Sequence, residues 1–488
     1  MEGRKKAGFV LGPLLFFTAY FLPLMPRNPE AHKLLAVFLL IVVLWVTESL
    51  PIPVSALIIP VLITALGVTT AKKAFAPFAN PIIMLFLGSF ILAKGMCVHA
   101  LDRKLAYSVL SLHNIRTRRI RILWAMGIIS AFLSFWISNT ATTAMMYPIA
   151  LGLIETYRSK EGKGALPFGT ALLLTLAYAA SIGGIGTPIG SPPNLIAIGM
   201  LEKLAGYKMT FFQWMVIALL ITLPMLIFLF VYMKIKIRRS GDSAGGRDIR
   251  DLLGGKPPKG FSPAQRNVLF AFSITVSLWV IPGMIALIWG RTAPAFIWLQ
   301  AHIPEAAAAI IGACLLFILP VNLKRGQFTL TLKEAMSVDW GTLLLFGGGL
   351  SLGFQMFETG LADSIGRYFI SLGGSTAPTA LITLLAITLT VFMTELTSNT
   401  ASANMIIPII IAIAQAASIN PLPPVLGSAI GCSFAFMLPV ATPPNAIIYG
   451  SGHIPLPVMM RTGLWLNLAG IFFIWVGVTF LAPLLGLI

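Results

Sequence analysis

Long apolar runs alternate with short polar stretches along almost the whole chain of 488 residues. A membrane-spanning helix needs about 20 mostly apolar residues, and most of the runs have about that length. The runs lie at 7–25, 34–50, 54–70, 81–98, 122–155, 168–201, 213–233, 268–289, 304–321, 341–358, 379–416, 423–452 and 463–487. This pattern predicts an all-α polytopic membrane protein.

The composition agrees with this interpretation. Apolar residues make up 57% of the chain and charged residues 10%, whereas soluble domains are about 45–50% apolar and about 25% charged. The 44 glycines and 33 prolines are typical of membrane helices that pack through small residues and are broken in places. The longest weakly apolar stretch, 234–267, is expected to be a cytoplasmic loop, which leaves no room for a large soluble domain.

The positive charge of the chain indicates its orientation. A net charge of +18 would also suit a nucleic-acid-binding protein, but basic residues that border apolar runs are what the positive-inside rule predicts. No nucleic-acid partner is therefore expected. Most lysines and arginines lie in the stretches 1–7, 112–123, 156–167, 234–267, 322–340 and 453–462. This distribution predicts a cell inner (plasma) membrane protein with a cytoplasmic N-terminus and an external C-terminus.

Two apolar runs are nearly twice as long as one span and have opposite flanking charge. The run at 122–155 has basic residues at both borders, which places both of its ends in the cytoplasm. The run at 379–416 has no lysine or arginine at either border, so both of its ends are expected outside. A segment that enters and leaves on one side is a re-entrant hairpin, whose tip must be buried in protein or line a wet cavity. Counting both hairpins as non-crossing leaves about 11 transmembrane helices.

The chain contains an internal repeat. Ser138-Asn139-Thr140-Ala141 recurs 260 residues later as Ser398-Asn399-Thr400-Ala401, and Gly88 matches Gly348 at the same shift. The segment 191–194 (SPPN) recurs as 442–445 (TPPN), now 251 residues later. Because one hairpin opens inward and the other outward, we expect inverted repeats. This arrangement is typical of transporters, with substrate and coupling ions near the membrane midplane.

The repeat divides the chain into four parts. N-terminal scaffold helices occupy 1–53, and the cytoplasmic loop occupies 234–267. The first repeat (54–233) holds the inward hairpin 122–155 and a broken helix at 168–201, and the second inverted repeat (268–488) holds the outward hairpin 379–416 and a broken helix at 423–452.

The polar residues of the motifs suit a cation and an anion together. Pro-Pro interrupts a helix, and we expect it to leave carbonyl groups unpaired as ligands for a hard cation. Helix N-termini favour anions. Ser134 and Thr394 correspond at the 260 shift and add hydroxyls, although any single hydroxyl can instead bond the carbonyl of the preceding helical turn. Glu395 has two alternative roles: it is a proton or cation partner, or it makes a structural hydrogen bond. No Lys, Arg or His lies in the hairpins or Pro-Pro segments, so sodium is expected to supply the counter-charge.

At these motifs the sequence resembles the divalent anion/sodium symporter family. The two Ser-Asn-Thr hairpins and the segments 186–194 (GTPIGSPPN) and 432–445 (CSFAFMLPVATPPN) carry the resemblance, which extends over essentially the whole chain. It implies a homodimer in which a transport domain slides like an elevator against a scaffold domain. It implies sodium sites at Ser134, Ser138, Asn139 and Gly190, and at Thr394, Thr397, Asn399 and Ala441. The implied substrate-binding residues are Asn139, Thr140, Ser191, Pro192, Asn399, Thr400, Thr442 and Pro443.

The resulting hypothesis is a sodium-coupled symporter of small dianions, above all C4-dicarboxylates such as succinate, in contact with membrane lipid. A sodium-independent anion exchanger on the same fold is the alternative, and citrate or sulfate symport is a further one. A passive channel is a further alternative function. An enzyme is not expected, because the chain has no HExxH motif and no Ser/His arrangement. Sodium ions are the only expected cofactors, and no organic cofactor is expected.

Overall fold

The computed structural model describes residues 2–112, 118–161, 165–237, 260–373 and 378–488. Helices dominate these residues, and the strands that occur among them are the short pair β1 (Pro320–Asn322) and β2 (Gln327–Phe328). The all-α class expected from the sequence is therefore confirmed. Most of the expected cytoplasmic loop, at 238–259, lies outside the described residues.

The first half of the chain follows the expected runs closely. Its helices are α1 (Glu2–Phe21), α2 (Pro29–Thr47), α3 (Ile52–Ala65), α4 (Ala71–Phe75), η1 (Ala76–Ala79), α5 (Pro81–Val98), α6 (Leu101–Leu110), α8 (Arg119–Ser134), α9 (Asn139–Glu161), α10 (Ala165–Gly184), α11 (Pro192–Leu204) and α12 (Phe211–Ile237).

The second half repeats this order from α16 to α24. Its helices are α14 (Pro263–Trp289), α15 (Pro294–His302), α16 (Glu305–Ile318), η4 (Leu323–Arg325), α17 (Leu332–Ala335), α18 (Trp340–Glu358), α19 (Leu361–Gly373), α20 (Thr379–Thr394), α21 (Asn399–Ala416), α22 (Leu422–Gly431), α23 (Pro443–Tyr449), α24 (Leu456–Val476), the π-helical η5 (Gly477–Leu481) and α25 (Ala482–Leu484).

The two long apolar runs each form a pair of helices joined by a short tip. In the first pair, α8 ends at Ser134 and α9 begins at Asn139; in the second, α20 ends at Thr394 and α21 begins at Asn399. The broken helices are also matched, because α11 and α23 both begin with the Pro-Pro dipeptide. A proline at the first helical position is favourable, since its missing N–H has no partner there. The Ser-Asn-Thr motifs therefore start helices, and the Pro-Pro motifs end the breaks.

The repeats interlock across two close helix crossings. Helix α5 packs on α16, and α18 packs on α3. A methyl group added at Gly88 of α5 would lie 2.6 Å from the Ala309 carbonyl oxygen, and one added at Gly348 of α18 would lie 2.4 Å from the Ala56 carbonyl oxygen. Equivalent glycines thus make equivalent crossings in the two repeats. In each case the helix that carries the glycine packs on a helix of the other repeat.

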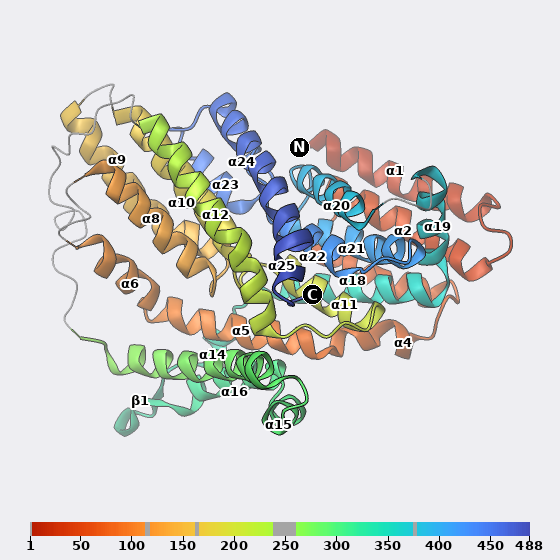
Figure 1. Cartoon of the computed structure of the whole chain (residues 1–488), viewed down its shortest axis with the longest axis horizontal. Coiled ribbons are helices and arrows are strands. Elements are labelled where there is room, and N and C mark those ends of the chain that lie inside the picture. Colours follow the sequence, from red (N-terminus) through yellow and green to blue (C-terminus); the bar gives the residue numbers. More distant parts are fainter. Residues whose placement is uncertain (1, 113–117, 162–164, 238–259, 374–377) are drawn as a thin grey trace.

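The motif-bearing helices interlock in the same way. Helix α8 packs on α10 and α20 on α22, whereas α11 packs on the hairpin helix α21 and α23 on the hairpin helix α9. In Figure 1, α8, α9, α10, α12 and α24 run side by side, and α14, α15 and α16 lie below them. The same view places α6 and β1 near one end of the molecule and α4 and α19 near the other.

The number of membrane crossings differs from the expected one when it is judged by helix length. Within the described residues, six helices are long and apolar enough to span a membrane, and the bent pair α15 and α16 makes a seventh. Four further apolar helices are shorter, namely Ile52–Ala65, Phe168–Gly184, Thr379–Thr394 and Leu422–Gly431. The breaks and hairpin tips shorten the last three of these helices, and the count of 11 stays a prediction.

Candidate functional site

The first Ser-Asn-Thr motif lies in a cluster of oxygen atoms. Ser134 at the end of α8 is fully buried, and its hydroxyl donates to Asn139 Oδ1 at the start of α9 over 2.5 Å. A methyl group added at Gly184 would lie 2.2 Å from Asn139 Oδ1, and one added at Gly190 would lie 2.6 Å from Gly184 O and 2.8 Å from Ser134 O. Oxygen atoms of Ser134, Asn139 and Gly184 therefore converge, with glycines on two sides. We call these residues and Gly190 cluster 1.

The second motif forms a matching cluster. Thr394 Oγ1 lies 2.8 Å from Asn399 Oδ1 and 2.8 Å from the carbonyl oxygen of Cys432. Thr394 is fully buried. A hydroxyl has one proton to donate, so the two acceptors compete for it and the cluster holds more oxygen lone pairs than hydrogens. We call Thr394, Asn399 and Cys432 cluster 2.

The asparagines of the two Pro-Pro motifs hold the breaks in shape. Asn194 Nδ2 donates to Gly184 O at 3.0 Å and to Thr187 O at 2.8 Å. In the second repeat, Asn445 Nδ2 donates to Ala435 O at 2.8 Å and to Leu438 O at 3.0 Å. The amide three residues after the first residue of each motif therefore pairs with carbonyls of the break, and the expectation of unpaired carbonyls in the turn before the prolines stays a prediction. The four acceptors correspond at the 251 shift.

Each hairpin tip is tied to the break of its own repeat. In the first repeat, Thr187 Oγ1 donates to Phe135 O at 2.5 Å. In the second, Glu395 accepts from the backbone N–H groups of Met437 and Leu438 at 2.8 and 3.0 Å. Asn467 Nδ2 of α24 also donates to Glu395, at 2.7 Å. These contacts favour the structural alternative for Glu395.

Several expected hydroxyls are used locally. Ser138 is exposed, and its Oγ accepts from Ala141 N at 3.3 Å. Thr397 Oγ1 is 2.5 Å from Ser402 Oγ, and Thr442 Oγ1 accepts from Asn445 N at 3.4 Å. These three side chains are not drawn into the clusters.

The remaining expected residues line the helix starts and the second break. Among the described residues, the hydroxyls of Thr140 and Thr400 make no hydrogen bond, which leaves them available to a ligand. Pro192 is half-buried, Pro443 is exposed, and Ala441 is buried within the break.

Sequence reasoning missed four residues of the site. Gly184 and Cys432 contribute backbone carbonyls, which the identity of a side chain cannot reveal. Asn194 and Asn445 stand in the repeated motif, so the repeat itself was a signal for them.

One basic side chain reaches the second hairpin from far away in the sequence. Arg4 of α1 donates to Leu396 O at the hairpin tip over 2.7 Å and also to Val46 O of α2. Leu396 faces outward from the tip, with 60% of its surface exposed. In the part of the chain that the structure describes, no group of three or more His, Cys, Asp or Glu side chains is placed to hold a metal ion. The available ligands are therefore hydroxyl, amide and carbonyl oxygens.

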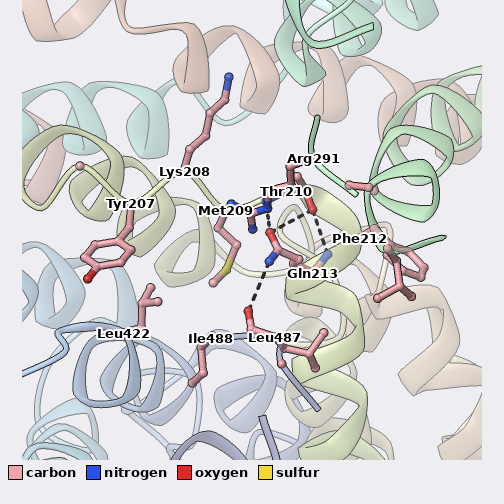
Figure 2. A pocket seen from close by; sticks show the side chains of 15 residues that line it. Tyr207, Lys208, Met209, Thr210, Phe212, Gln213, Arg291, Leu422, Leu487 and Ile488 are labelled. Atoms are coloured by element: carbon pink, nitrogen blue, oxygen red, sulfur yellow. Dashed lines mark hydrogen bonds between the residues drawn. The ribbon is translucent and has the colours of Figure 1, made fainter. Parts of the chain in front are cut away.

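A cavity of about 510 Å³ lies elsewhere, at the start of α12. Figure 2 shows Gln213 at its centre, where the side chain accepts from Thr210 N and donates to Leu487 O. Arg291 and Phe212 also line it. None of the expected site residues lines this cavity, so its size does not mark the motif site.

The family model of the sodium:sulfate symporter transmembrane region matches residues 10–487. The chain belongs to this family. The resemblance drawn from the motifs is thereby confirmed. The protein is a multi-pass membrane protein, and its family consists of transporters rather than enzymes.

Curated relatives cover nearly the whole chain. The sodium-dependent dicarboxylate transporter SdcS of Staphylococcus saprophyticus is 34% identical over 98% of this chain and 91% of its own length. SdcS of Staphylococcus aureus USA300 is 32% identical over the same shares. An uncharacterized transporter of Haemophilus influenzae is 35% identical over 94% of this chain and 93% of its own.

Solved transporters share the fold of this family member. The YdaH transporter of Alcanivorax borkumensis aligns with a TM-score of 0.58 at 12% identity, over 92% of this chain and 97% of its own. MtrF of Neisseria gonorrhoeae aligns with a TM-score of 0.59 at 14% identity, over 94% and 97%. Identities this low support the fold alone.

Proposed function

We propose that this protein is a sodium-coupled symporter that imports small dianions, C4-dicarboxylates such as succinate above all. The relatives named sodium-dependent dicarboxylate transporter, at 32–34% identity over 98% of the chain, support both the sodium coupling and the substrate class. The observation that carries the proposal is the pair of oxygen clusters at equivalent places in the two repeats.

Each cluster suits a sodium ion, because it gathers hard oxygen ligands and offers few protons. In cluster 1 the ligands are drawn from Ser134, Ser138, Asn139 and Gly190, with the Gly184 carbonyl added by its position. In cluster 2 they are drawn from Thr394, Thr397, Asn399 and Ala441, with the Cys432 carbonyl added. The Ser138 side chain is exposed and the Thr397 hydroxyl is bonded to Ser402. Both residues therefore take part through their backbone carbonyls.

The dianion binds between the two hairpin tips. Helices α9, α11 and α21 begin at the motifs, and the partial positive charge of a helix N-terminus attracts anions. The unpaired hydroxyls of Thr140 and Thr400 stand in the first turns of α9 and α21 and meet the carboxylates. Asn139, Asn399, Ser191, Pro192, Thr442 and Pro443 complete the site. The chain places no Lys, Arg or His in these segments, so bound sodium supplies the positive charge and substrate binding depends on it.

Transport proceeds by an elevator movement within a homodimer. The moving part comprises α8–α12 and α20–α24, whose hairpins and broken helices interlock, and the fixed part comprises α1–α5 and α14–α18. The amphipathic helices α6 and α19 connect the parts. The protein lies in the plasma membrane with its N-terminus in the cytoplasm and its C-terminus outside.

Uptake of radiolabelled succinate into vesicles that contain the purified protein tests the proposal. We expect accumulation only with an inward sodium gradient, and competition by malate and fumarate that is stronger than competition by citrate or sulfate. Uptake that persists when choline replaces sodium and succinate is loaded inside would instead identify an exchanger. Uptake that never exceeds equilibrium would identify a channel.

A further inference from the structure

A single hydrogen bond between two buried serines joins the repeats at the motifs. The hydroxyl oxygens of Ser191 and Ser433 are 2.9 Å apart. Ser191 is 2% exposed and Ser433 is fully buried. Ser191 ends the first break, and Ser433 follows α22 in the other repeat. The bond therefore connects segments 242 residues apart in the sequence.

This bond joins the residues that directly follow a member of each oxygen cluster in the chain. Ser191 follows Gly190, where an added methyl group would lie 2.6 Å from the Gly184 carbonyl oxygen and 2.8 Å from the Ser134 carbonyl oxygen of cluster 1. Ser433 follows Cys432, whose carbonyl accepts from Thr394 in cluster 2. The path from Gly190 to Cys432 therefore consists of two adjacent peptide units and one hydrogen bond.

The repeats differ at this point, although they match elsewhere. Thr442, the equivalent of Ser191, uses its hydroxyl to cap its own helix through Asn445 N. The hydroxyl of Ser191 makes no capping bond with α11, so it is directed to the other repeat. Position 182, the equivalent of Ser433, is an isoleucine, so the bond has no symmetric counterpart. The pseudo-symmetry of the fold does not account for the bond.

We infer that Ser433 is a positioning residue that couples the two sodium sites by holding Ser191. The inference rests on the proposed function. When sodium draws the ligands of one cluster together, the Ser191–Ser433 bond favours the bound geometry of the other cluster, and by linkage the effect is reciprocal. Ser433 acts through Ser191 and contacts neither ion.

The test measures succinate uptake by the full-length protein in vesicles over a range of sodium concentrations. In Ser433→Ala we expect the sodium Hill coefficient to fall toward unity and the half-saturating sodium concentration to rise about fivefold, as the loss of one buried hydrogen bond implies. The succinate KM at saturating sodium is expected to change by less than about twofold, because a coupling defect acts before the sites are full. Ser433→Cys keeps the size of the side chain and donates weakly, so it should give an intermediate result.

Ser428→Ala is the matched control. Ser428 lies in α22, is fully buried, and its hydroxyl has no hydrogen-bond partner among the described residues. This variant should behave as the wild type. A wild-type sodium response in both Ser433 variants, or an equal loss in Ser428→Ala, would overturn the inference while leaving the proposed function intact. Sodium-independent uptake by the wild type would overturn the proposed function and the inference with it.

Discussion

At the scale of single residues, two glycines limit the space of cluster 1. Neither Gly184 nor Gly190 has the positive φ angle that favours glycine, so the requirement comes from close approach rather than from the backbone conformation. A methyl group at Gly184 would lie nearest to Asn139 Oδ1, and one at Gly190 would lie nearest to the carbonyl oxygens of Gly184 and Ser134. Glycine is needed there because any side chain would displace those oxygens.

Gly184→Ala should therefore impair sodium activation. The added methyl group would lie 2.2 Å from Asn139 Oδ1, and overpacking of this kind costs about 1–3 kcal/mol. We expect the half-saturating sodium concentration to rise by about fivefold or more, measured as sodium-dependent uptake. Gly3→Ala in α1 is the control, since no atom of the described residues would lie within 4 Å of its methyl group. An unchanged sodium response in Gly184→Ala would remove Asn139 from the sodium site.

Asn194→Ala and Asn445→Ala should destabilise the protein to a similar extent. Each substitution removes two hydrogen bonds. The Thr187 and Leu438 carbonyls keep a backbone donor, whereas the Gly184 or Ala435 carbonyl loses the one side-chain donor described for it, at a cost of about 1–3 kcal/mol. The expected result is a lower melting temperature of the purified protein for both variants. Asn322→Ala, which removes the cap of a surface turn, should change it much less. A large effect from one asparagine alone would contradict the equivalence of the two breaks.

At the scale of elements, a buried carboxylate joins the second hairpin to its surroundings. Glu395 sits on the hairpin tip, and its donors come from the break before α23 and from α24. The first repeat makes the corresponding contact with a threonine hydroxyl and a backbone carbonyl instead. The position of a hairpin tip against its break is thus maintained in both repeats, by different groups.

Glu395→Gln should weaken sodium binding at cluster 2. Glutamine has one acceptor oxygen, so at least one buried N–H donor loses its partner, at a cost of about 1–3 kcal/mol. We expect a higher half-saturating sodium concentration and a lower melting temperature, measured on the same preparation. Glu305→Gln is the control, because one oxygen of Glu305 accepts from Phe211 N and glutamine keeps such an oxygen. Equal effects of the two substitutions would argue against a special role for the hairpin contact.

At the scale of the whole molecule, the hairpins of the proposed moving part touch helices of the proposed fixed part. The rings of Trp136 at the first hairpin tip and Phe272 of α14 lie edge to face, 5.2 Å apart. At the second tip, Arg4 holds Leu396 next to the end of α2. An elevator movement must break both contacts.

A chemical link between the hairpin and α14 should stop transport. We expect a short bifunctional thiol reagent to abolish uptake when cysteines replace Trp136 and Phe272 and the native Cys97, Cys314 and Cys432 are replaced by alanine. Cysteines at Phe228 and Phe473 are the control, because α12 and α24 both belong to the moving part and their rings are 6.4 Å apart. Full uptake by the first linked pair would contradict the division into a moving and a fixed part.

Much of the architecture could be predicted because a membrane imposes simple rules on a sequence. Apolar length indicated the positions of the helices, and the repeated motifs indicated the two hairpins and the two Pro-Pro breaks, whereas the helix starts at Asn139 and Asn399 came from the structure. These features depend on local chemistry, which a linear pattern records. Short elements such as α15 and the β1–β2 pair were not predicted, because their sequences are neither long apolar runs nor periodic in hydrophobicity.

The amino-acid sequence by itself determined the family and the helical class, and it singled out the residues around which the proposed site is built. Only the tertiary structure decided which oxygens converge, because the Gly184 and Cys432 carbonyls carry no trace in the identity of their side chains. It also decided that Asn194 and Asn445 satisfy the broken helices, that Glu395 binds backbone, and that Ser191 meets Ser433. Such contacts join segments from tens to hundreds of residues apart, and their geometry exists only once the two repeats have packed against each other.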